Sequence, residues 1–352
     1  MRILITGGAG FVGGNLGVHL SQCGHTVIAL DNLVRRGSEY NLSRLWNHGI
    51  EFRHGDVRCP EDWRDIKADV VLECSAQPSA IDGYQNPVFD FTNNTVPLIH
   101  LLDWCRQRQA GIILWSTNKV YPVHAVHNQR IIETPERYVS EKAIDENTPL
   151  DGGDRSLYGA SKVMADLMVQ EWSDAFKIPA IVNRFSCLAG PWQWGKCEQG
   201  WVAWWMIAHR LGLPLKYIGF QGKQVRDVLF VDDLCRLIEM QIEKMPIGKV
   251  YNVGGGKYNS ISLRECTHFC QQITGRKVPI SIMEEPRRAD FAVYISDTAK
   301  VEKDYGWFPT VFNEEGLEQI DEWAVGHLPL LSNLFEISAS YGTTKLAIEN
   351  RR

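Results

Sequence analysis

Tyr158 and Lys162 are the two side chains of this sequence whose types and spacing are best suited to acid–base chemistry. Residues four apart on a helix lie one turn above each other, so the phenol and the ammonium can share one pocket. A tyrosine has a reference pKa of about 10, and a fixed cation beside it favours the phenolate, which can take a proton from an alcohol. The spacing alone is weak evidence, because it recurs at Tyr138/Lys142 and Tyr341/Lys345. The elements around Tyr158 must therefore supply its context.

Length and composition bound the fold and the partners. A chain of 352 residues with 44% hydrophobic and 22% charged content is long enough for one large or two ordinary domains. A net charge of −5 and a pI near 6.1 give no electrostatic reason to expect nucleic acid or an acidic membrane as a partner. We expect a globular protein that binds neither.

The nine cysteines are scattered and form no C-x-x-C motif, which is typical of buried thiols in a reducing compartment. Cys266, His268 and Cys270 lie close in sequence, but helical spacing turns His268 away from the two thiols. A zinc site normally needs four converging ligands, so we predict no metal site.

No targeting or membrane segment is expected. The first residues form a short apolar run that ends in a glycine turn, without the length or the cleavage site of a signal peptide. The longest apolar stretch, 200–215, is interrupted by His209 and Arg210 and falls short of the roughly 18 residues of a membrane span. The sequence predicts a cytoplasmic protein.

Strand and helix patterns alternate through the first third of the chain. Helical periodicity separates the apolar runs, first through Val12, Leu16 and Leu20 and later over 97–105. This alternation predicts an α/β fold with a parallel sheet covered by helices on both faces, which binds ligands at the carboxyl ends of its strands. The predicted strands are 3–6, 26–30, 51–53, 70–73 and 111–115.

The turn after the first strand carries a cofactor signal. Its glycines fit G-x-x-G-x-x-G through Gly7, Gly10 and Gly13, or G-x-G-x-x-G if Gly8 replaces Gly7. Either pattern provides a tight turn, a close backbone approach to a pyrophosphate, and a helix that begins with Phe11 and Val12 and packs closely on the sheet. A glycine turn without a ligand is the alternative. Its position between a strand and an amphipathic helix favours a dinucleotide site.

The ends of the next strands would complete this site. Asp31 ends the second strand, where a carboxylate accepts hydrogen bonds from the adenosine ribose and repels a 2′-phosphate, which favours NAD over NADP. Arg35 and Arg36 follow closely and could soften that preference. The further cofactor contacts that we predict at this edge are Asn32, Asp56, Val57 and Ala76.

Thr117 ends the fifth predicted strand and supplies the context for Tyr158. Its hydroxyl would enter the crevice that receives the nicotinamide, although a threonine there can also simply satisfy the backbone. A helix that starts near Tyr158 returns to the same crevice, and the next strand begins near Pro179. Tyr138 lies in a polar loop and Tyr341 near the C-terminus, so neither can be placed at the strand ends.

With these motifs, residues 1–323 resemble an extended short-chain dehydrogenase/reductase that acts on a nucleotide sugar. Within that family the chain is most similar to the CDP-paratose (CDP-tyvelose) 2-epimerase branch. The segments that carry this resemblance are 31–39, 116–121, 149–151, 198–203 and 222–227.

The resemblance implies a Rossmann doubly wound parallel sheet with a smaller mixed α/β C-terminal substrate domain. The NAD-binding domain would span 1–185 and be rejoined by a segment around 226–255. The nucleotide-sugar-binding domain would span 186–323, and a C-terminal tail 324–352. The family commonly forms homodimers through the helix that carries Tyr158 and the helix near 97–105, and Met164, Met168 and Trp172 are apolar enough to contribute.

The resemblance also implies the roles of individual residues. Thr117, Tyr158 and Lys162 would be catalytic, and Asn94, on the helix before the fifth strand, would support the lysine through water. Tyr217 would form a wall for the nucleotide base. Arg226 and Arg287 would contact the diphosphate, because guanidinium groups match phosphate oxygens, although either arginine could also be a solvated surface charge. The implied substrate contacts are Thr117, Gln199, Tyr217, Arg226, Arg287 and Asp290.

Asn118 and Lys119 discriminate among the family's reactions. The 4,6-dehydratases carry an Asp-Glu pair there, because eliminating water needs an additional acid and base. The sequence therefore favours an NAD-dependent epimerase that works by reversible oxidation, at C2 of a CDP-linked dideoxyhexose if the branch resemblance holds. Departures from the branch at Pro122, 189–193 and 196–197 leave the particular sugar open. A net dehydrogenase or reductase, an epimerase at another carbon, and a non-catalytic NAD-sensing protein remain alternatives.

Overall fold

A seven-stranded sheet forms the first half of the molecule in a computed structural model that describes residues 1–77, 82–196 and 199–335. All strands run parallel in the order β12-β8-β5-β4-β1-β2-β3. The direction of winding reverses between β1 and β4, and such switch points open a crevice at the strand ends. The strands are β1 (Arg2–Thr6), β2 (Thr26–Asp31), β3 (Glu51–His54), β4 (Val70–Glu73), β5 (Gly111–Thr117), β8 (Ala180–Phe185) and β12 (Lys249–Val253).

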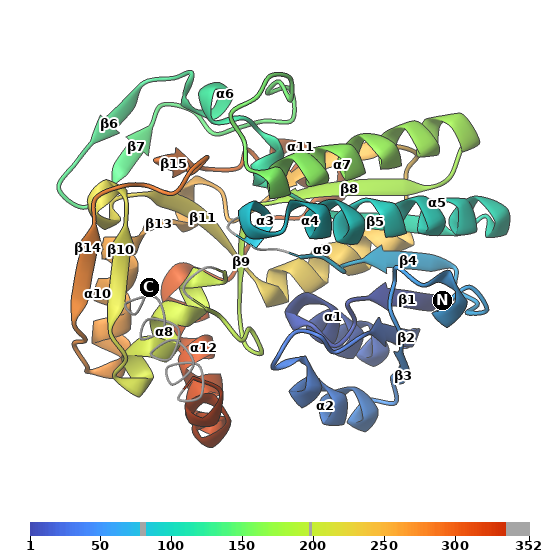
Figure 1. Cartoon of the computed structure of the whole chain (residues 1–352), viewed down its shortest axis with the longest axis horizontal. Helices are drawn as coiled ribbons and strands as arrows, with labels where there is room; N and C mark the ends of the chain where they lie inside the picture. The colour runs from blue at the N-terminus through green and yellow to red at the C-terminus, as the bar shows by residue number, and fades with distance from the viewer. Residues whose placement is uncertain (78–81, 197–198, 336–352) are drawn as a thin grey trace, which may run out of the picture.

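Helices cover both faces of this sheet because its buried strands present apolar side chains on both sides. Ile3 and Ile5 of β1 belong to the core under one helical layer, whereas Leu4 belongs to the core under the other. Figure 1 shows α5 and α7 along one face and α1 and α2 on the other. The helices of this half are α1 (Phe11–Gln22), α2 (Leu42–Asn47), α3 (Asp82–Gln85), α4 (Pro87–Asn94), α5 (Val96–Arg108), α6 (Val123–His127), α7 (Leu157–Phe176) and α9 (Val231–Glu243).

The second half is a smaller mixed α/β unit with its own core. Strand β11 pairs with β9 and β15 in parallel and with β13 in antiparallel fashion, and β10 pairs in parallel with β14. Its elements are β9 (Cys187–Ala189), α8 (Trp201–Leu211), β10 (Leu215–Ile218), β11 (Val225–Phe230), β13 (Ser260–Ser262), α10 (Leu263–Thr274), β14 (Ile280–Met283), β15 (Val293–Tyr294) and α12 (Asn313–Gly326). A hairpin of β6 (Ile131–Glu133) and β7 (Tyr138–Ser140) borders it.

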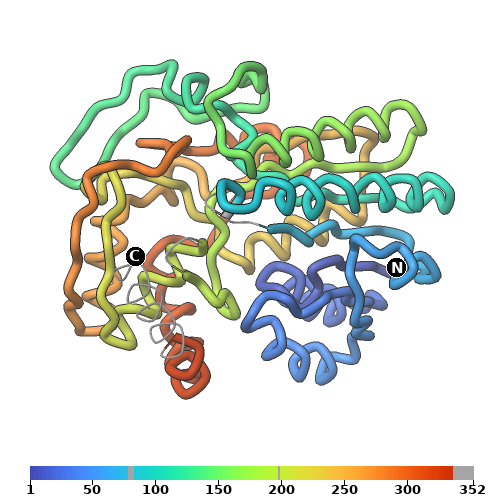
Figure 2. Tube along the Cα trace, in the orientation of Figure 1, coloured from blue at the N-terminus to red at the C-terminus, as the bar shows by residue number. Residues whose placement is uncertain are grey.

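The chain passes between the two halves more than once, as the trace in Figure 2 shows. Strand β12 lies within the predicted rejoining segment and forms an edge of the large sheet beside β8. Helix α11 (Ala299–Tyr305) falls inside the stretch 186–323, yet its Val301 and the following Trp307 belong to the core of the large sheet. The domains are therefore interleaved in sequence.

The predicted C-terminal tail begins as packed structure. Leu331 and Leu334 are buried in the core of the second half, and the rings of Phe335 and Trp204 lie 5.0 Å apart. The pair Tyr341/Lys345, which repeats the four-residue spacing of Tyr158 and Lys162, lies outside the described residues. Within the described ranges, no helix has the length and apolarity to cross a membrane.

Candidate active site

A cavity of about 870 Å³ lies between the two halves, at the carboxyl ends of the large sheet. Most of the predicted site residues come together there, although β1, β5 and β11 that carry many of them are far apart in sequence. Three predicted residues, Asp56, Asn94 and Tyr217, are not in its lining. The predicted residues that line it are Gly7, Gly10, Phe11, Val12, Gly13, Asp31, Asn32, Val57, Ala76, Thr117, Tyr158, Lys162, Gln199, Arg226, Arg287 and Asp290.

The glycine turn has the geometry of a dinucleotide cradle. Gly7 has a φ of +61°, which side chains disfavour, and its carbonyl accepts a hydrogen bond from the Gly10 N–H. A Cβ on Gly13 would lie 2.3 Å from the Gly7 oxygen, so only glycine allows the helix to approach the turn this closely. Helix α1 starts at Phe11 at the cavity, where its first N–H groups can bind a pyrophosphate.

Asp31 lies at the end of β2 with both carboxylate oxygens anchored. Oδ2 accepts from the Ala9 N–H at 3.0 Å and Oδ1 from the Leu33 N–H at 2.8 Å. Burial raises the pKa of Asp31, and these backbone donors oppose the rise. The carboxylate is thereby fixed at the cavity wall, where a ribose would approach it.

Asp56 lies behind the cofactor edge and not in it. Its carboxylate pairs with Arg58 at 2.6 Å and accepts from the amide of Asn32 at 2.9 Å. The hydrogen bonds from Arg58 hold the pKa of Asp56 well below its ordinary value. In this structure Asp56 therefore orients Asn32, while Asn32 and Val57 face the cavity.

Asn94 connects the loop after β4 to helix α7. It is the last residue of α4, whereas the helix directly before β5 is α5. The predicted position, on the helix before the fifth strand, is therefore wrong by one helix. The Asn94 side chain accepts from the Gln77 N–H at 2.9 Å and donates to Ser161 Oγ at 3.1 Å. Support of Lys162 by Asn94 through water stays a prediction.

Tyr158 and Lys162 lie on the first turns of α7. Ser156 caps this helix, and its hydroxyl accepts from the Gly159 N–H at 3.0 Å. Both catalytic candidates are buried and line the cavity. By contrast, Tyr138 lies on β7, so its four-residue spacing from Lys142 is not helical.

The electrostatics around Tyr158 differ from the expectation. Burial raises its pKa to about 12, and the neighbouring Thr117 side chain opposes the rise only in part. The Lys162 ammonium donates to the Trp115 carbonyl at 3.0 Å, and burial lowers its pKa while Glu73 opposes that effect. The expected lowering of the tyrosine pKa by Lys162 finds no support in this structure, where the ammonium is hydrogen-bonded to the Trp115 carbonyl.

Thr117 meets Tyr158 in the cavity as predicted from the strand end. It also caps the short turn that follows β5, because its Oγ1 accepts from the Lys119 N–H at 3.3 Å. The backbone role and the contact with Tyr158 therefore coexist. One strand end and one helix start place the two hydroxyl groups side by side.

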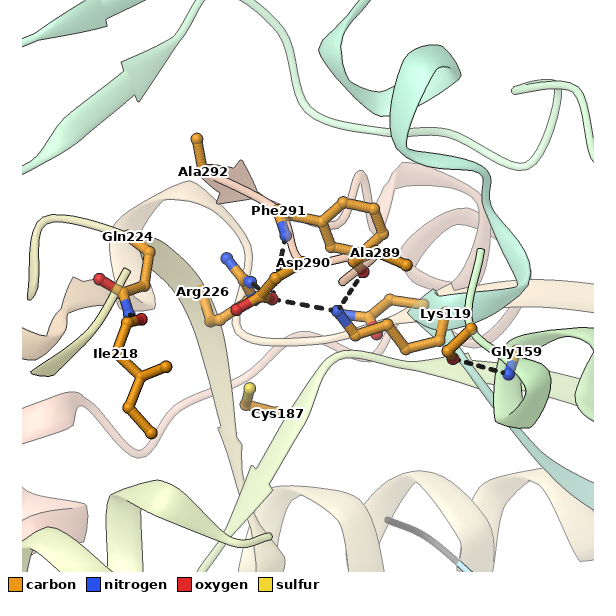
Figure 3. A network of polar contacts seen from close by, with 12 residues as sticks. Lys119, Gly159, Cys187, Ile218, Gln224, Arg226, Ala289, Asp290, Phe291 and Ala292 are labelled. Atoms are coloured by element: carbon orange, nitrogen blue, oxygen red, sulfur yellow. Dashed lines mark hydrogen bonds and ion pairs between the residues drawn. The ribbon is translucent and has the colours of Figure 1, made fainter. Parts of the chain in front are cut away.

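Charged side chains organise the end of the cavity around Arg226. Arg226 of β11 is buried, and its Nη2 lies 2.6 Å from Asp290 Oδ1. Lys119 Nζ approaches the same oxygen at 3.2 Å, and Figure 3 shows both cations converging on it. Burial raises the pKa of Asp290, but the two cations outweigh this and hold it below its ordinary value.

Tyr217 is not a cavity wall. Its ring stacks on Trp205 with centroids 6.1 Å apart, and its hydroxyl bonds to Thr267 at 2.9 Å. Side chains alternate along a strand, so Lys216 and Ile218 face the cavity in its place.

The sequence analysis gave Glu73 no role in the site and did not foresee the partner of Arg35. Glu73 ends the apolar strand β4 as a buried carboxyl group that accepts from the hydroxyl groups of Thr6 and Ser75. The signal in the sequence was a charged residue at the end of an otherwise apolar strand. Arg35 donates to Gln199 across the cavity, and both line it, but no local pattern reveals a contact between two such distant loops.

Metal-capable side chains occur away from the cavity. His268 is exposed whereas Cys266 and Cys270 are buried, as the helical spacing predicts. Among the described residues, one group that could hold an ion consists of His19, Cys23 and Glu239, none of which lines the cavity.

Comparisons with known proteins agree with this geometry. The model of the NAD dependent epimerase/dehydratase family matches residues 3–254. CDP-paratose 2-epimerase of Salmonella typhi is 32% identical over 340 residues, which cover 92% of this chain and 99% of that protein. dTDP-glucose 4,6-dehydratase of Salmonella typhimurium is 24% identical over 351 residues and 95% of each chain.

The fold agrees as well. The crystal structure of Thermus thermophilus UDP-glucose 4-epimerase in complex with NAD aligns with a TM-score of 0.77 and 26% identity, covering 92% of this chain and 99% of that one.

Proposed function

Because the chain belongs to the NAD dependent epimerase/dehydratase family, we propose that it is an epimerase that inverts C2 of a CDP-linked hexose or dideoxyhexose. NAD is its cofactor, and the family acts on nucleotide sugars. The reaction would pass through a transient 2-keto sugar with the cofactor retained. The observation that carries this proposal is that Thr117, Tyr158 and Lys162 line the same cavity as the glycine turn.

The chain's own residues divide the work between two ends of the cavity. At one end, Tyr158 in its phenolate form takes the proton from a sugar hydroxyl while the Thr117 hydroxyl bonds the same oxygen as charge develops. At the other end, Arg226 offers a guanidinium to the diphosphate and Asp290 a carboxylate to a ribose hydroxyl. NAD, which the glycine turn and Asp31 would hold, would supply a reversible two-electron oxidation of the carbinol. The ketone then turns before it is reduced on its opposite face.

The cavity offers no second acid–base pair in the place where dehydratases have one. Asn118 has an amide, which does not exchange protons at neutral pH, and its Oδ1 lies 3.4 Å from Thr117 Oγ1. The Lys119 ammonium is bonded to Asp290 and to the Ala289 carbonyl at 3.3 Å. This arrangement favours epimerisation over elimination of water.

Assignment of CDP and of C2 rests on the similarity to the Salmonella typhi CDP-paratose 2-epimerase and on the segments quoted above. The decisive experiment incubates the purified protein, assayed for co-purified NAD, with CDP-sugars and without added cofactor. Retention of a C2 deuterium label in the C2-inverted product supports the proposal. A stoichiometric need for external NAD would instead identify a net dehydrogenase or reductase. Binding of NAD and sugar nucleotide without any turnover would identify an NAD-sensing protein.

The assembly that we propose is a homodimer through α5 and α7. Five apolar side chains on these helices are 42–48% exposed, namely Val96, Ile99, Met164, Leu167 and Phe176. Met168 and Trp172, predicted for this interface, are partly buried and pack instead on the protein's own core. Light scattering should give twice the chain mass for the wild type and the monomer mass for a Met164→Glu/Leu167→Glu variant. A monomeric wild type would refute the interface.

A further inference from the structure

Lys119 occupies a position between the catalytic groups and the nucleotide end of the cavity. Its backbone belongs to the catalytic end, since its N–H donates to Thr117 Oγ1 and a Cβ on Gly159, next to Tyr158, would lie 2.4 Å from its carbonyl oxygen. Its side chain reaches in the other direction to Asp290, as Figure 3 shows. One residue therefore spans both ends.

The side chain of Lys119 contacts a loop that contains a strained residue. Residues 287–290, here termed the nucleotide loop, contain Ala289 in the left-handed region with a φ of +56°, a costly conformation for a residue with a Cβ. Lys119 Nζ donates to the Ala289 carbonyl at 3.3 Å, and lies 4.2 Å from the centre of the Phe291 ring. The lysine thus contacts the loop at its strained residue.

The same contact directs the Asp290 carboxylate. Three donors converge on its Oδ1, from Arg226 at 2.6 Å, from Lys119 at 3.2 Å and from the Phe291 N–H at 2.9 Å. In the described part of the chain no hydrogen bond reaches Oδ2, and Asp290 lines the cavity. One oxygen is anchored, and the other is presented to a ligand hydroxyl.

We propose that Lys119 is a positioning residue that couples the nucleotide loop to Thr117 and Tyr158, so that a nucleoside diphosphate bound at Asp290 orders the catalytic end. The proposal depends on the proposed function only in assigning Asp290 to the nucleotide. A lysine is suited to this role because its ammonium can lie over the Phe291 ring while its donors bond two loop atoms. Equilibrium coupling of this kind is reciprocal, so it can be measured without turnover.

The test compares Lys119→Met with the wild type, and uses Lys223→Met as the matched control. Lys223 forms an ion pair with Glu133 at 2.6 Å outside the cavity lining. The probe is cytidine diphosphate, titrated calorimetrically into the NAD-loaded protein. We expect Lys119→Met to weaken its binding about tenfold, as expected for loss of a charge-assisted contact, and Lys223→Met to leave it unchanged.

Hydrogen exchange at saturating cytidine diphosphate then tests the coupling itself. In the wild type the nucleotide should slow exchange both in 287–291 and in 117–121, whereas in Lys119→Met it should slow only the former. Asp290→Asn, which weakens the ion pair from its other end, should also uncouple the segments and serves if Lys119→Met does not fold. Wild-type affinity in Lys119→Met, or joint protection of both segments in either folded variant, would overturn the proposal. Because no step requires turnover, failure of epimerase activity leaves this result interpretable.

Discussion

The hydroxyl of Thr117, at the end of β5, lies beside the phenol of Tyr158, at the start of α7, in the lining of one cavity. The Thr117 side chain favours the phenolate against the effect of burial, so its removal should raise the tyrosine pKa further. In Thr117→Val, the ascending limb of the pH profile of kcat/KM, which reports deprotonation of the base, should therefore move to higher pH, with a rate loss of about 10- to 100-fold at neutral pH. Thr117→Ser, which keeps the hydroxyl, should retain the wild-type profile. An unshifted limb in the valine variant would contradict the assignment.

Tyr158→Phe tests the phenol itself. Loss of the group that transfers the proton should lower kcat by about 10²- to 10⁴-fold. Bound NAD, measured after release from the purified protein, should remain at the wild-type level, because the glycine turn and Asp31 are untouched. Tyr138→Phe is the matched control and should keep full activity. Equal losses in the two variants would reject Tyr158 as the base.

Gly13→Ala should separate cofactor binding from folding. The new Cβ would lie 2.3 Å from the Gly7 oxygen and 2.7 Å from the Gly8 Cα, so the cofactor turn must move. Strain of about 1–3 kcal/mol on that turn corresponds to a roughly 5- to 150-fold weaker affinity for NAD, measured by calorimetry. Gly326→Ala is the control, since nothing lies within 4 Å of its Cβ position. Normal NAD binding by Gly13→Ala would show that the turn is not the cradle.

Asp166 anchors helix α7 to the large sheet. Its carboxylate accepts from Arg184 at 2.9 and 3.0 Å and from Ser116 Oγ at 2.9 Å, and both charged side chains are buried. Asp166→Asn leaves the buried guanidinium without its counter-charge, which should cost about 3–5 kcal/mol of unfolding free energy in urea titration. Asp65→Asn, which removes an exposed partner of Arg53, should not change stability measurably. Comparable losses in both would argue against a special role for the buried pair.

The sheet and its cofactor edge were predictable because their signals are local. Three features can each be recognised from the residues next to them in the sequence. They are the glycine turn between strand and helix, the acidic residue at the end of β2 and the threonine at the end of β5. The parallel topology then brings them to one edge. The five predicted strands all occur, each within a few residues of the predicted bounds.

The remaining features depend on distances that the sequence does not encode locally. Tyr217 was assigned to the wrong face because a shift of one residue reverses the side of a strand that a side chain occupies. The tyrosine pKa was misjudged because helical spacing places Lys162 near Tyr158 but does not determine what its ammonium contacts. The contact of Lys119 with Asp290 joins residues 171 positions apart in the sequence, and only the folded structure brings them together.

The interleaving of the two halves has a consequence for biosynthesis. Trp307 and Val301 complete the core beneath a sheet whose first strand starts at Arg2. Domains usually mature in the order in which they leave the ribosome. Here the N-terminal sheet acquires its last core residues only when nearly the whole polypeptide has emerged, so a nascent chain that stalls before Trp307 presents an incompletely covered hydrophobic face.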